Sequence, residues 1–200
     1  MSLFLSCLEI SFYIFVVLVE YYIIYSFIRS KMGKYPPYVP TRKEMVQEIV
    51  KEISPFLENA SSAMNITEPG CGDARIIAAL AKKFPQHSFT GYEWDVVPYF
   101  LAKITTKKYK NIRVVRQNFM TADYTKENFV ILFTGDEIAA ELSKKLSADL
   151  PDDALILSQS FKVPEMTCIK EIETAKKNYF FLPPKLYWYK KSGKKENQAV

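Results

Sequence analysis

The sequence predicts a doubly wound α/β fold, whose mostly parallel sheet ends in an antiparallel hairpin. Three observations support this prediction: short apolar runs alternate with segments of helical periodicity, a glycine-containing turn follows the first run, and no helix separates the last two runs. The chain has 200 residues, of which 48% are hydrophobic and 24% are charged. This composition suits one globular domain with a short additional segment.

The first thirty residues are predicted to form one transmembrane helix. Residues 10–28 are 19 residues with Glu20 as their only charge, and about 20 apolar residues are needed to cross a bilayer. Met1–Glu9 contains no Lys or Arg, and no small-x-small cleavage site follows. We therefore interpret the segment as an uncleaved anchor rather than a signal peptide. The alternative is a buried or interfacial helix packed on the domain, and Glu20 keeps it open because a lone carboxylate is costly in hydrocarbon.

The residues after this segment predict its orientation and the start of the domain. Arg29, Lys31 and Lys34 follow at once, so the positive-inside rule places the rest of the chain on the cytoplasmic side, or on the matrix side of a mitochondrial membrane. Residues 33–40 (GKYPPYVP) contain three prolines and cannot continue a helix. We expect an anchor over residues 1–30, a proline-rich linker over 31–40 and a single domain over 41–200.

The domain is predicted to open with an amphipathic helix and then to alternate strands with helices. Thr41 and Glu44 have the spacing of a capping box, and apolar residues from Met45 to Leu57 recur at helical spacing. Strands are expected over residues 64–68, 88–93, 112–116, 129–133 and 154–161, and helices over 74–84, 97–108 and 137–146. The strand-like residues 169–175 and 186–190 are joined by a Pro-Pro turn, so they must pair antiparallel and complete a seven-stranded sheet.

The cysteines, the histidine and the lysines limit the classes of function. Cys7, Cys71 and Cys168 are far apart and form no Cys-x-x-Cys pair, so we expect free thiols in a reducing compartment and no metal site. His87 is the only histidine and lies in a polar loop, where we expect it to be solvated rather than catalytic. The net charge of +5 comes from scattered lysine pairs, so no nucleic-acid partner is expected.

A glycine-containing turn carries the clearest functional signal. Gly70 and Gly72 lie in the segment EPGCGDAR (residues 68–75), between a predicted strand and a predicted helix. Glycine allows a tight turn and a close approach of the backbone to a ligand, and the helix amides point at whatever binds. Arg75 stands where the dinucleotide fingerprint has its third glycine, which argues against a pyrophosphate-bearing cofactor.

Two further strand ends carry residues suited to a nucleoside. Glu93 closes the second predicted strand, 21 positions after Gly72, where an acid accepts hydrogen bonds from ribose hydroxyls. Asn118 follows the third strand and is predicted to bond the adenine edge, while Phe119 packs on the ring. The order of these residues at three successive strand ends predicts a nucleoside-type ligand.

The motifs together resemble those of the membrane-anchored lysine methyltransferases, typified by the mitochondrial enzymes acting on the ADP/ATP carrier and the ATP synthase c-subunit, with prokaryotic relatives. The matching stretches are residues 37–41 (PYVPT), 70–76 (GCGDARI), 91–93 (GYE), 145–146 with 149–151, and 160–161. The segment PYVPT, just after a hydrophobic helix, is the most specific of these. The resemblance implies a class I methyltransferase fold with S-adenosylmethionine as cofactor.

The resemblance also implies roles for single residues. The residues expected around the methionine half of the cofactor are Glu68, Gly70, Gly72 and Asp73, with Glu93 at the ribose and Tyr38 and Thr41 closing over the methionine carboxylate. Ala74 departs from the family pattern, because it replaces the usual glycine of Gly-Asp-Gly-Arg and narrows the loop. The acidic pair Asp136-Glu137 is a second departure.

The acceptor side is predicted after the fourth strand. Methyl transfer is an in-line displacement and needs a neutral lysine, so the protein must align the amine and accept its proton. Thr134, Asp136 and Glu137 lie where acceptors bind in open α/β sheets, and we expect one of them to line the acceptor channel. Helix capping and the helix dipole explain the two acids equally well.

Several alternatives remain open. Residues 133–136 (FTGD) are not the Asn/Asp-Pro-Pro-aromatic loop expected of a nucleic-acid amino-methyltransferase. A lipid or another small membrane-dissolved acceptor suits an anchored enzyme as well as a protein does. A non-catalytic, cofactor-binding membrane module is the third possibility. The hypothesis adopted is a monomer that contacts the bilayer and methylates a lysine of a protein in or near the membrane.

Overall fold

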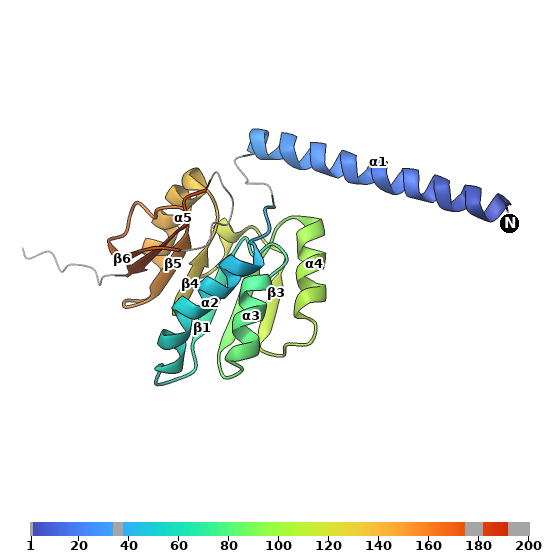
Figure 1. Ribbon diagram of the computed structural model, residues 1–200. Helices are drawn as coiled ribbons and strands as arrows, with labels where there is room; N and C mark the ends of the chain where they lie inside the picture. The colour runs from blue at the N-terminus through green and yellow to red at the C-terminus, as the bar shows by residue number, and fades with distance from the viewer. Residues whose placement is uncertain (1, 34–37, 175–181, 192–200) are drawn as a thin grey trace, which may run out of the picture. The chain divides into compact units, whose positions relative to one another are not determined.

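A computed structural model of the chain describes residues 2–33, 38–174 and 182–191 (Figure 1). The chain divides into two compact units, Met1–Pro37 and Tyr38–Val200. The first unit contains helix α1 (Ser2–Gly33). The elements of the second unit are α2 (Lys43–Glu58), β1 (Asn65–Pro69), α3 (Arg75–Lys83), β2 (Ser88–Tyr92), α4 (Val96–Thr106), β3 (Ile112–Val115), the 3-10 turn η1 (Phe119–Thr121), β4 (Phe129–Leu132), α5 (Asp136–Asp149), β5 (Leu155–Gln159), β6 (Cys168–Glu173) and β7 (Lys185–Lys190).

Helix α1 contains the apolar segment that the sequence predicts. Ser6–Tyr25 is 20 residues long and, among the described residues, is the one stretch of helix long and apolar enough to cross a membrane. Most of the side chains that the structure describes in α1 are exposed. Length and composition fit a signal sequence as well as a membrane span.

The sheet of the second unit has seven strands in the order β3-β2-β1-β4-β5-β7-β6. Strands β1 to β5 pair in parallel, whereas β7 pairs antiparallel with both β5 and β6. The predicted doubly wound sheet with its antiparallel terminal hairpin is therefore confirmed. Because β1 to β5 are parallel, their C-terminal ends meet along one side of the sheet, which we call the carboxyl edge.

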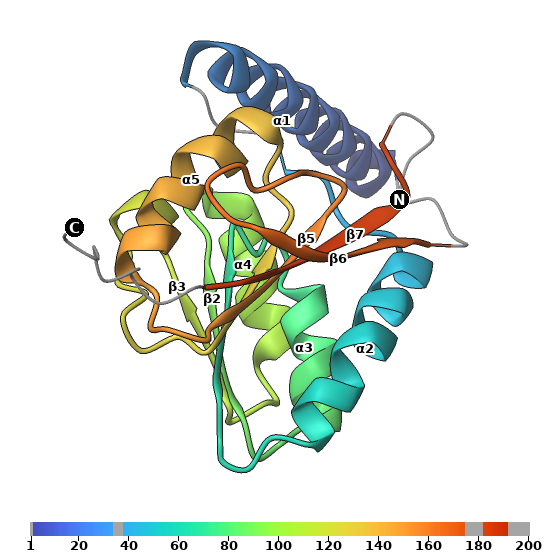
Figure 2. The same cartoon turned by 90° about the vertical axis from the view of Figure 1, so that its left-hand side faces the viewer.

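Helices cover both faces of this sheet (Figure 2). Helices α2, α3 and α4 pack on one face through a core that includes Met45, Ile49 and Ile77. Helix α5 packs on the opposite face, where Leu142 and Leu146 meet residues of β4, β5 and β7. The two apolar layers fix the strands and therefore fix the residues that follow each strand at the carboxyl edge.

Two local predictions are wrong. Thr41 does not begin a capping box, because Arg42 is the N-cap residue of α2, its backbone is extended, and its side chain makes no capping hydrogen bond. His87 is not solvated: it is 2% exposed, and its Nδ1 accepts a hydrogen bond from the Met64 amide at 3.1 Å. Its Nε2 lies 3.1 Å from the Leu57 carbonyl, so His87 connects the end of α2 to the start of the sheet.

Candidate active site

Strand β2 fixes the glycine turn that follows β1. The amides of Gly70 and Cys71 donate to the Tyr92 carbonyl at 2.8 and 3.0 Å. The amide of Gly72 donates to Oε2 of Glu93 at 2.9 Å, and Oε1 of Glu93 accepts from the Asp95 amide at 2.8 Å. The turn and the acid at the end of the second strand, which the sequence predicts as one site, therefore lie in direct contact.

Two features of position 72 favour glycine: its backbone conformation and the small space beside its α-carbon. Its φ of +57° is in the left-handed region, which side chains rarely adopt. A Cβ atom at Gly72 would lie 2.6 Å from Cε2 of Tyr38, so the tyrosine ring lies directly on the turn. Tyr38 and Gly72 are therefore in contact, and the role of Tyr38 over the methionine carboxylate stays a prediction.

Arg75 connects the segment before α2 to the glycine turn. Its guanidinium pairs with Asp73, with Nη2 at 2.5 Å from Oδ2, and Nη1 donates to the Thr41 carbonyl at 2.8 Å. Burial and the neighbouring Asp73 carboxylate, which also hydrogen-bonds the Tyr38 hydroxyl, raise the pKa of Tyr38 to about 12. Tyr38, Thr41 and Asp73 therefore belong to one network. Arg75 is a site residue that the sequence prediction missed, although its place in the motif was the available signal.

The site is rich in carboxylates. Burial raises the pKa of Glu68 well above its ordinary value, and the negative charges of Asp73 and Glu93 act in the same direction. Burial is also the main cause of the raised pKa of Glu93. Within the described part of the chain, Oε2 of Glu68 is buried and has no hydrogen-bond partner. Of these three acidic residues, only Asp73 has its negative charge balanced by Arg75. The arrangement therefore favours a ligand that carries positive charge.

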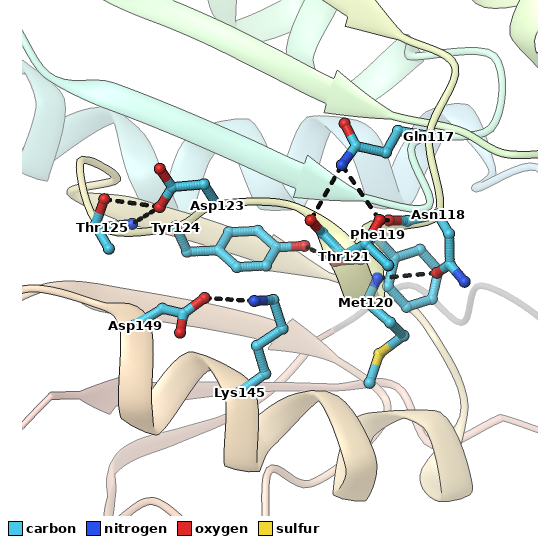
Figure 3. Close-up of polar contacts among 10 residues, drawn as sticks. All are labelled: Gln117, Asn118, Phe119, Met120, Thr121, Asp123, Tyr124, Thr125, Lys145 and Asp149. Carbon is cyan, nitrogen blue, oxygen red and sulfur yellow. Dashed lines mark hydrogen bonds and ion pairs between the residues drawn. The ribbon is translucent and has the colours of Figure 1, made fainter.

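The segment after β3 is held by its own hydrogen bonds (Figure 3). Oδ1 of Asn118 accepts from the Met120 amide at 2.9 Å and caps the turn η1. The hydroxyl of Tyr124, which is fully buried, donates to the Phe119 carbonyl at 2.7 Å. The ring of Phe119 lies beside Gly70, because a Cβ atom added to Gly70 would be 3.7 Å from Cε1 of Phe119, in ordinary van der Waals contact. Asn118 and Phe119 are therefore fixed beside the glycine turn, and Tyr124 is a positioning residue that the sequence prediction missed.

The residues predicted on the acceptor side lie apart from this network. Thr134 follows β4, is 3% exposed, and its Oγ1 is buried without a partner among the described residues. Asp136 and Glu137 form the exposed first turn of α5, after Gly135 with its φ of +85°. No hydrogen bond or ion pair in the described part of the chain joins these three residues to the glycine turn.

Gln159, at the end of β5, is a further residue that the sequence prediction missed. It is 1% exposed, and both polar atoms of its side-chain amide lack partners among the described residues. Strand β5 pairs with β4, and the last pair in the register is Leu132 with Ser158. The next residue of each strand is Phe133 and Gln159, so these two residues lie side by side. The rings of Phe133 and Phe161 lie 5.9 Å apart. The signal in the sequence was a glutamine at the end of an otherwise apolar run.

The strand order and the carboxyl-edge site define the architecture of a class I methyltransferase. A solved RNA methyltransferase from Salinibacter ruber, in complex with S-adenosyl-L-homocysteine, matches with a TM-score of 0.65 at 16% identity, over 77% of this chain and 94% of that one. A methyltransferase from Pyrococcus furiosus matches with a TM-score of 0.58 at 16% identity, over 86% and 96%. At these identities the likeness shows the fold.

The family is shown by sequence. The family model described as the ANTKMT methyltransferase domain matches residues 68–170, and the chain belongs to this family. The chain is 25% identical over 136 residues to the human lysine N-methyltransferase named for the ATP synthase c-subunit, covering 66% of this chain and 54% of that protein. It is 26% identical over 130 residues to a protein-lysine N-methyltransferase of Saccharolobus islandicus (strain REY15A), covering 64% and 78%. The chain thus spans about half the length of the human protein, and the predicted resemblance is confirmed.

Proposed function

We propose that the chain is an S-adenosylmethionine-dependent methyltransferase that modifies a lysine side chain of a membrane or membrane-proximal protein. The observation that carries the proposal is the 2.9 Å hydrogen bond from the Gly72 amide to Glu93, because it joins the turn after β1 to the acid after β2 at one end of the sheet. Membership of the ANTKMT family and the names of the two lysine methyltransferases support the same activity.

The residues around the glycine turn fit this cofactor. S-adenosylmethionine carries a sulfonium and an ammonium group, which suit the excess of buried carboxylates, and a free ribose diol, which suits Glu93. The unpartnered Oε2 of Glu68 would accept a hydrogen bond from the ammonium group. Tyr38, Thr41, Gly70, Gly72 and Asp73 would surround the methionine half, and Asn118 and Phe119 the adenine. When bound, the cofactor would supply an electrophilic methyl group.

We place the acceptor amine at the ends of β4 and β5. The aliphatic part of a lysine side chain would pack against the aromatic pair of Phe133 and Phe161, whose ring centroids lie 5.9 Å apart. Gln159 Oε1 and Thr134 Oγ1 are neutral acceptors, so they would orient a neutral amine while stabilising its ammonium form less than a carboxylate would. Of the three catalytic residues proposed from the sequence, Thr134 is the one that is buried and unpartnered.

Asp136 and Glu137 suit a different step. The methylated nitrogen carries a positive charge as the C–N bond forms, and it returns to neutrality by losing a proton. Both carboxylates are exposed at the first turn of α5, two and three residues after Thr134. We assign them the role of accepting this proton and passing it to water.

Membrane anchoring completes the proposal. Helix α1 supplies 20 residues suited to a bilayer, and Arg29, Lys31 and Lys34 follow, which favours a single-pass protein with its domain on the cytoplasmic or matrix side. A membrane protein whose lysine lies near the interface would be within reach of an enzyme tethered in this way. The human relative is named for a protein target, the c-subunit of ATP synthase.

Transfer of a labelled methyl group tests the proposal. Full-length protein and methyl-tritiated S-adenosylmethionine are added to membranes from cells that lack the chain, and the label is followed in protein and in lipid extract. We expect the label in one membrane protein, on a lysine identified by mass spectrometry. Label in the lipid fraction would instead indicate a lipid acceptor, and no label in either fraction would indicate a non-catalytic module.

Two variants serve as controls in this experiment. Glu93→Ala removes the acid that contacts Gly72 and should abolish labelling. Glu58→Ala removes an exposed carboxylate at the end of α2, paired with Lys83 at 3.0 Å, and should leave labelling unchanged because exposed ion pairs contribute little. Equal labelling by the two variants would contradict the proposed site.

A further inference from the structure

The outer face of α4 is unusually apolar. Eight large hydrophobic side chains are exposed in the described part of the second unit, and only Val39 and Ile169 lie away from α4. The other six are Trp94, Val96, Val97, Phe100, Leu101 and Ile104, with exposed fractions from 41% to 73%. We call these six residues the α4 patch. Exposed apolar surface concentrated in this way marks an interaction site.

The sequence of α4 explains the patch. The inward side of the helix is already complete, because Pro98, Ala102 and Thr106, spaced four residues apart, are buried. Phe100 and Ile104, also four residues apart, lie on the opposite side and are 59% and 73% exposed. A surface helix needs one apolar stripe to pack on its own domain, so a second apolar side requires a second apolar environment.

Positive charge surrounds the patch. Residues 94–117 contain six Lys or Arg and one Asp, so this segment carries as much net charge as the whole chain, which is +5. Lys103, Lys107 and Lys108 are exposed on α4 and just after it. Long lysine side chains extend from an apolar surface to anionic headgroups, and tryptophan is favoured at the boundary between headgroups and hydrocarbon.

We propose that the α4 patch docks the domain on the surface of an anionic lipid bilayer. The inference rests on the membrane anchoring proposed above. It favours lipid over a protein partner because α1 contains a segment of membrane-spanning length and only residues 34–37 separate α1 from the second unit. Trp94 directly follows Glu93, so docking through the patch brings the cofactor end of the carboxyl edge to the interface, where a lysine of a membrane protein emerges.

The two tryptophans of the chain provide the test. Trp94 belongs to the patch and is 46% exposed, whereas Trp188 is 8% exposed in the core. Full-length protein is reconstituted in vesicles of phosphatidylcholine and phosphatidylglycerol, and its fluorescence is measured with brominated lipid and, separately, with aqueous acrylamide. We expect brominated lipid to quench part of the emission and acrylamide to leave that part unquenched. In Trp94→Phe, the lipid-quenched part should be lost.

The other results overturn the proposal. Quenching of Trp94 by acrylamide alone would mean that the patch faces water. Protection from both quenchers would mean that protein covers the patch, either a second copy or α1 itself. Flotation of the same vesicles separates this failure from failure of the anchor, because a chain that does not float with lipid lacks the anchor, whereas one that floats without lipid quenching lacks only the docking surface.

Charge substitutions give an independent readout that does not depend on methyl transfer. The double variant Phe100→Glu/Ile104→Glu places two carboxylates in the exposed patch and should abolish quenching by brominated lipid. Ile169→Glu is the matched control, since Ile169 is 56% exposed on β6, and its quenching should equal that of the unmodified chain. Quenching that persists in the double variant would contradict docking through α4.

Discussion

The carboxyl edge has two halves that differ in how their polar groups are satisfied. In the half formed after β1, β2 and β3, backbone amides, carboxylates and a buried tyrosine hydroxyl bond to one another, as Gly72 does with Glu93 and Tyr124 does with Phe119. In the half formed after β4 and β5, Thr134 and Gln159 are buried and, among the described residues, have side-chain polar atoms without partners. The first half is therefore held mainly by its own hydrogen bonds, with Oε2 of Glu68 as an unpartnered exception, whereas the second half has neutral polar groups left for the acceptor proposed above.

This difference has an energetic meaning. We call the half after β1, β2 and β3 the cofactor half. Because its internal bonds already fix it, less conformational entropy is lost when the cofactor binds. We call the half after β4 and β5 the acceptor half. An unpartnered buried amide there lowers the free energy of unfolding by about 1–3 kcal/mol per group, and this loss is recovered only when a substrate supplies the partner. The unpartnered groups of Thr134 and Gln159 thus lower stability at the proposed acceptor site, and changes in the two halves should have different effects.

The largest effect is expected in the acceptor half. Gln159→Leu removes the unpartnered amide, so kcat should fall roughly 100-fold because the amine is no longer aligned, while the Kd for S-adenosylmethionine stays unchanged. The variant should also be more stable than the parent, because a buried polar group has been removed. Steady-state kinetics, titration calorimetry and thermal unfolding measure these quantities. Gln47→Leu, on the exposed side of α2, is the control; an unchanged kcat in Gln159→Leu would remove the distinction between the halves.

In the cofactor half, Glu68→Gln should act on binding. The substitution keeps the shape but removes the charge that faces the proposed ammonium group, so the Kd for S-adenosylmethionine should rise roughly tenfold, since a hydrogen bond to a charged group contributes about 1.5–3 kcal/mol. Titration calorimetry on the full-length protein measures the change. An unchanged Kd would show that Glu68 is only structural.

The pH dependence of the cofactor half follows from its raised pKa values. Glu68 and Glu93 have a higher pKa in the folded protein than in the unfolded chain, so the folded state binds more protons, and their contribution to stability is lost as the pH rises through the raised values. A cationic ligand favours the ionised carboxylates. The increase in Tm caused by S-adenosylmethionine should therefore grow with pH, and a ligand effect that is equal at low and high pH would contradict the cationic fit.

Tyr124→Phe tests how firmly the nucleoside side is fixed. The substitution removes the 2.7 Å bond to the Phe119 carbonyl in the buried segment beside α5, and the free energy of unfolding should fall by about 1–2 kcal/mol. Cofactor affinity should weaken less than in Glu68→Gln, because no ligand-contacting group is lost. Denaturant unfolding checks the first result, and an unchanged stability would mean that the segment holds its shape without this bond.

The smallest effect concerns the departure from the family pattern. Ala74 has a φ of +61°, in the left-handed region where a side chain costs about 1–2 kcal/mol. Ala74→Gly should relieve this strain and raise the Tm by about 2–4 °C. Thermal unfolding with and without the cofactor gives the result, and a lower Tm would show that the conformation of Ala74 carries no strain.

The cofactor half was predictable from the sequence because its requirements act over short stretches of chain. A turn with positive φ requires glycine at Gly72, and parallel strands place Glu93 beside it at a fixed separation. The strand order was predictable for a similar reason, since alternation and the terminal hairpin limit the topology. The family itself was predictable once PYVPT and the glycine motif were combined.

The remaining features depend on packing between distant segments. In the sequence Gln159 is an ordinary strand-end residue, and its burial is evident only from the structure. Arg75 joins the site through a hydrogen bond to the Thr41 carbonyl, 34 residues away. His87 was expected in solvent, yet the Met64 amide and the Leu57 carbonyl hold it in the interior. Local spacing carries no information about such contacts. The roles of Thr134, Asp136 and Glu137 remain predictions.

The most direct measurement is titration calorimetry of S-adenosylmethionine on the full-length protein and on Glu93→Ala. We expect one binding site per chain in the unmodified protein and a loss of affinity of roughly 100-fold in Glu93→Ala, because the acid both holds the Gly72 amide and is proposed to receive the ribose. Glu58→Ala should bind like the unmodified protein. Equal affinity in the unmodified protein and Glu93→Ala, with both folded, would contradict the claim that the turn after β1 and the acid after β2 form the cofactor site.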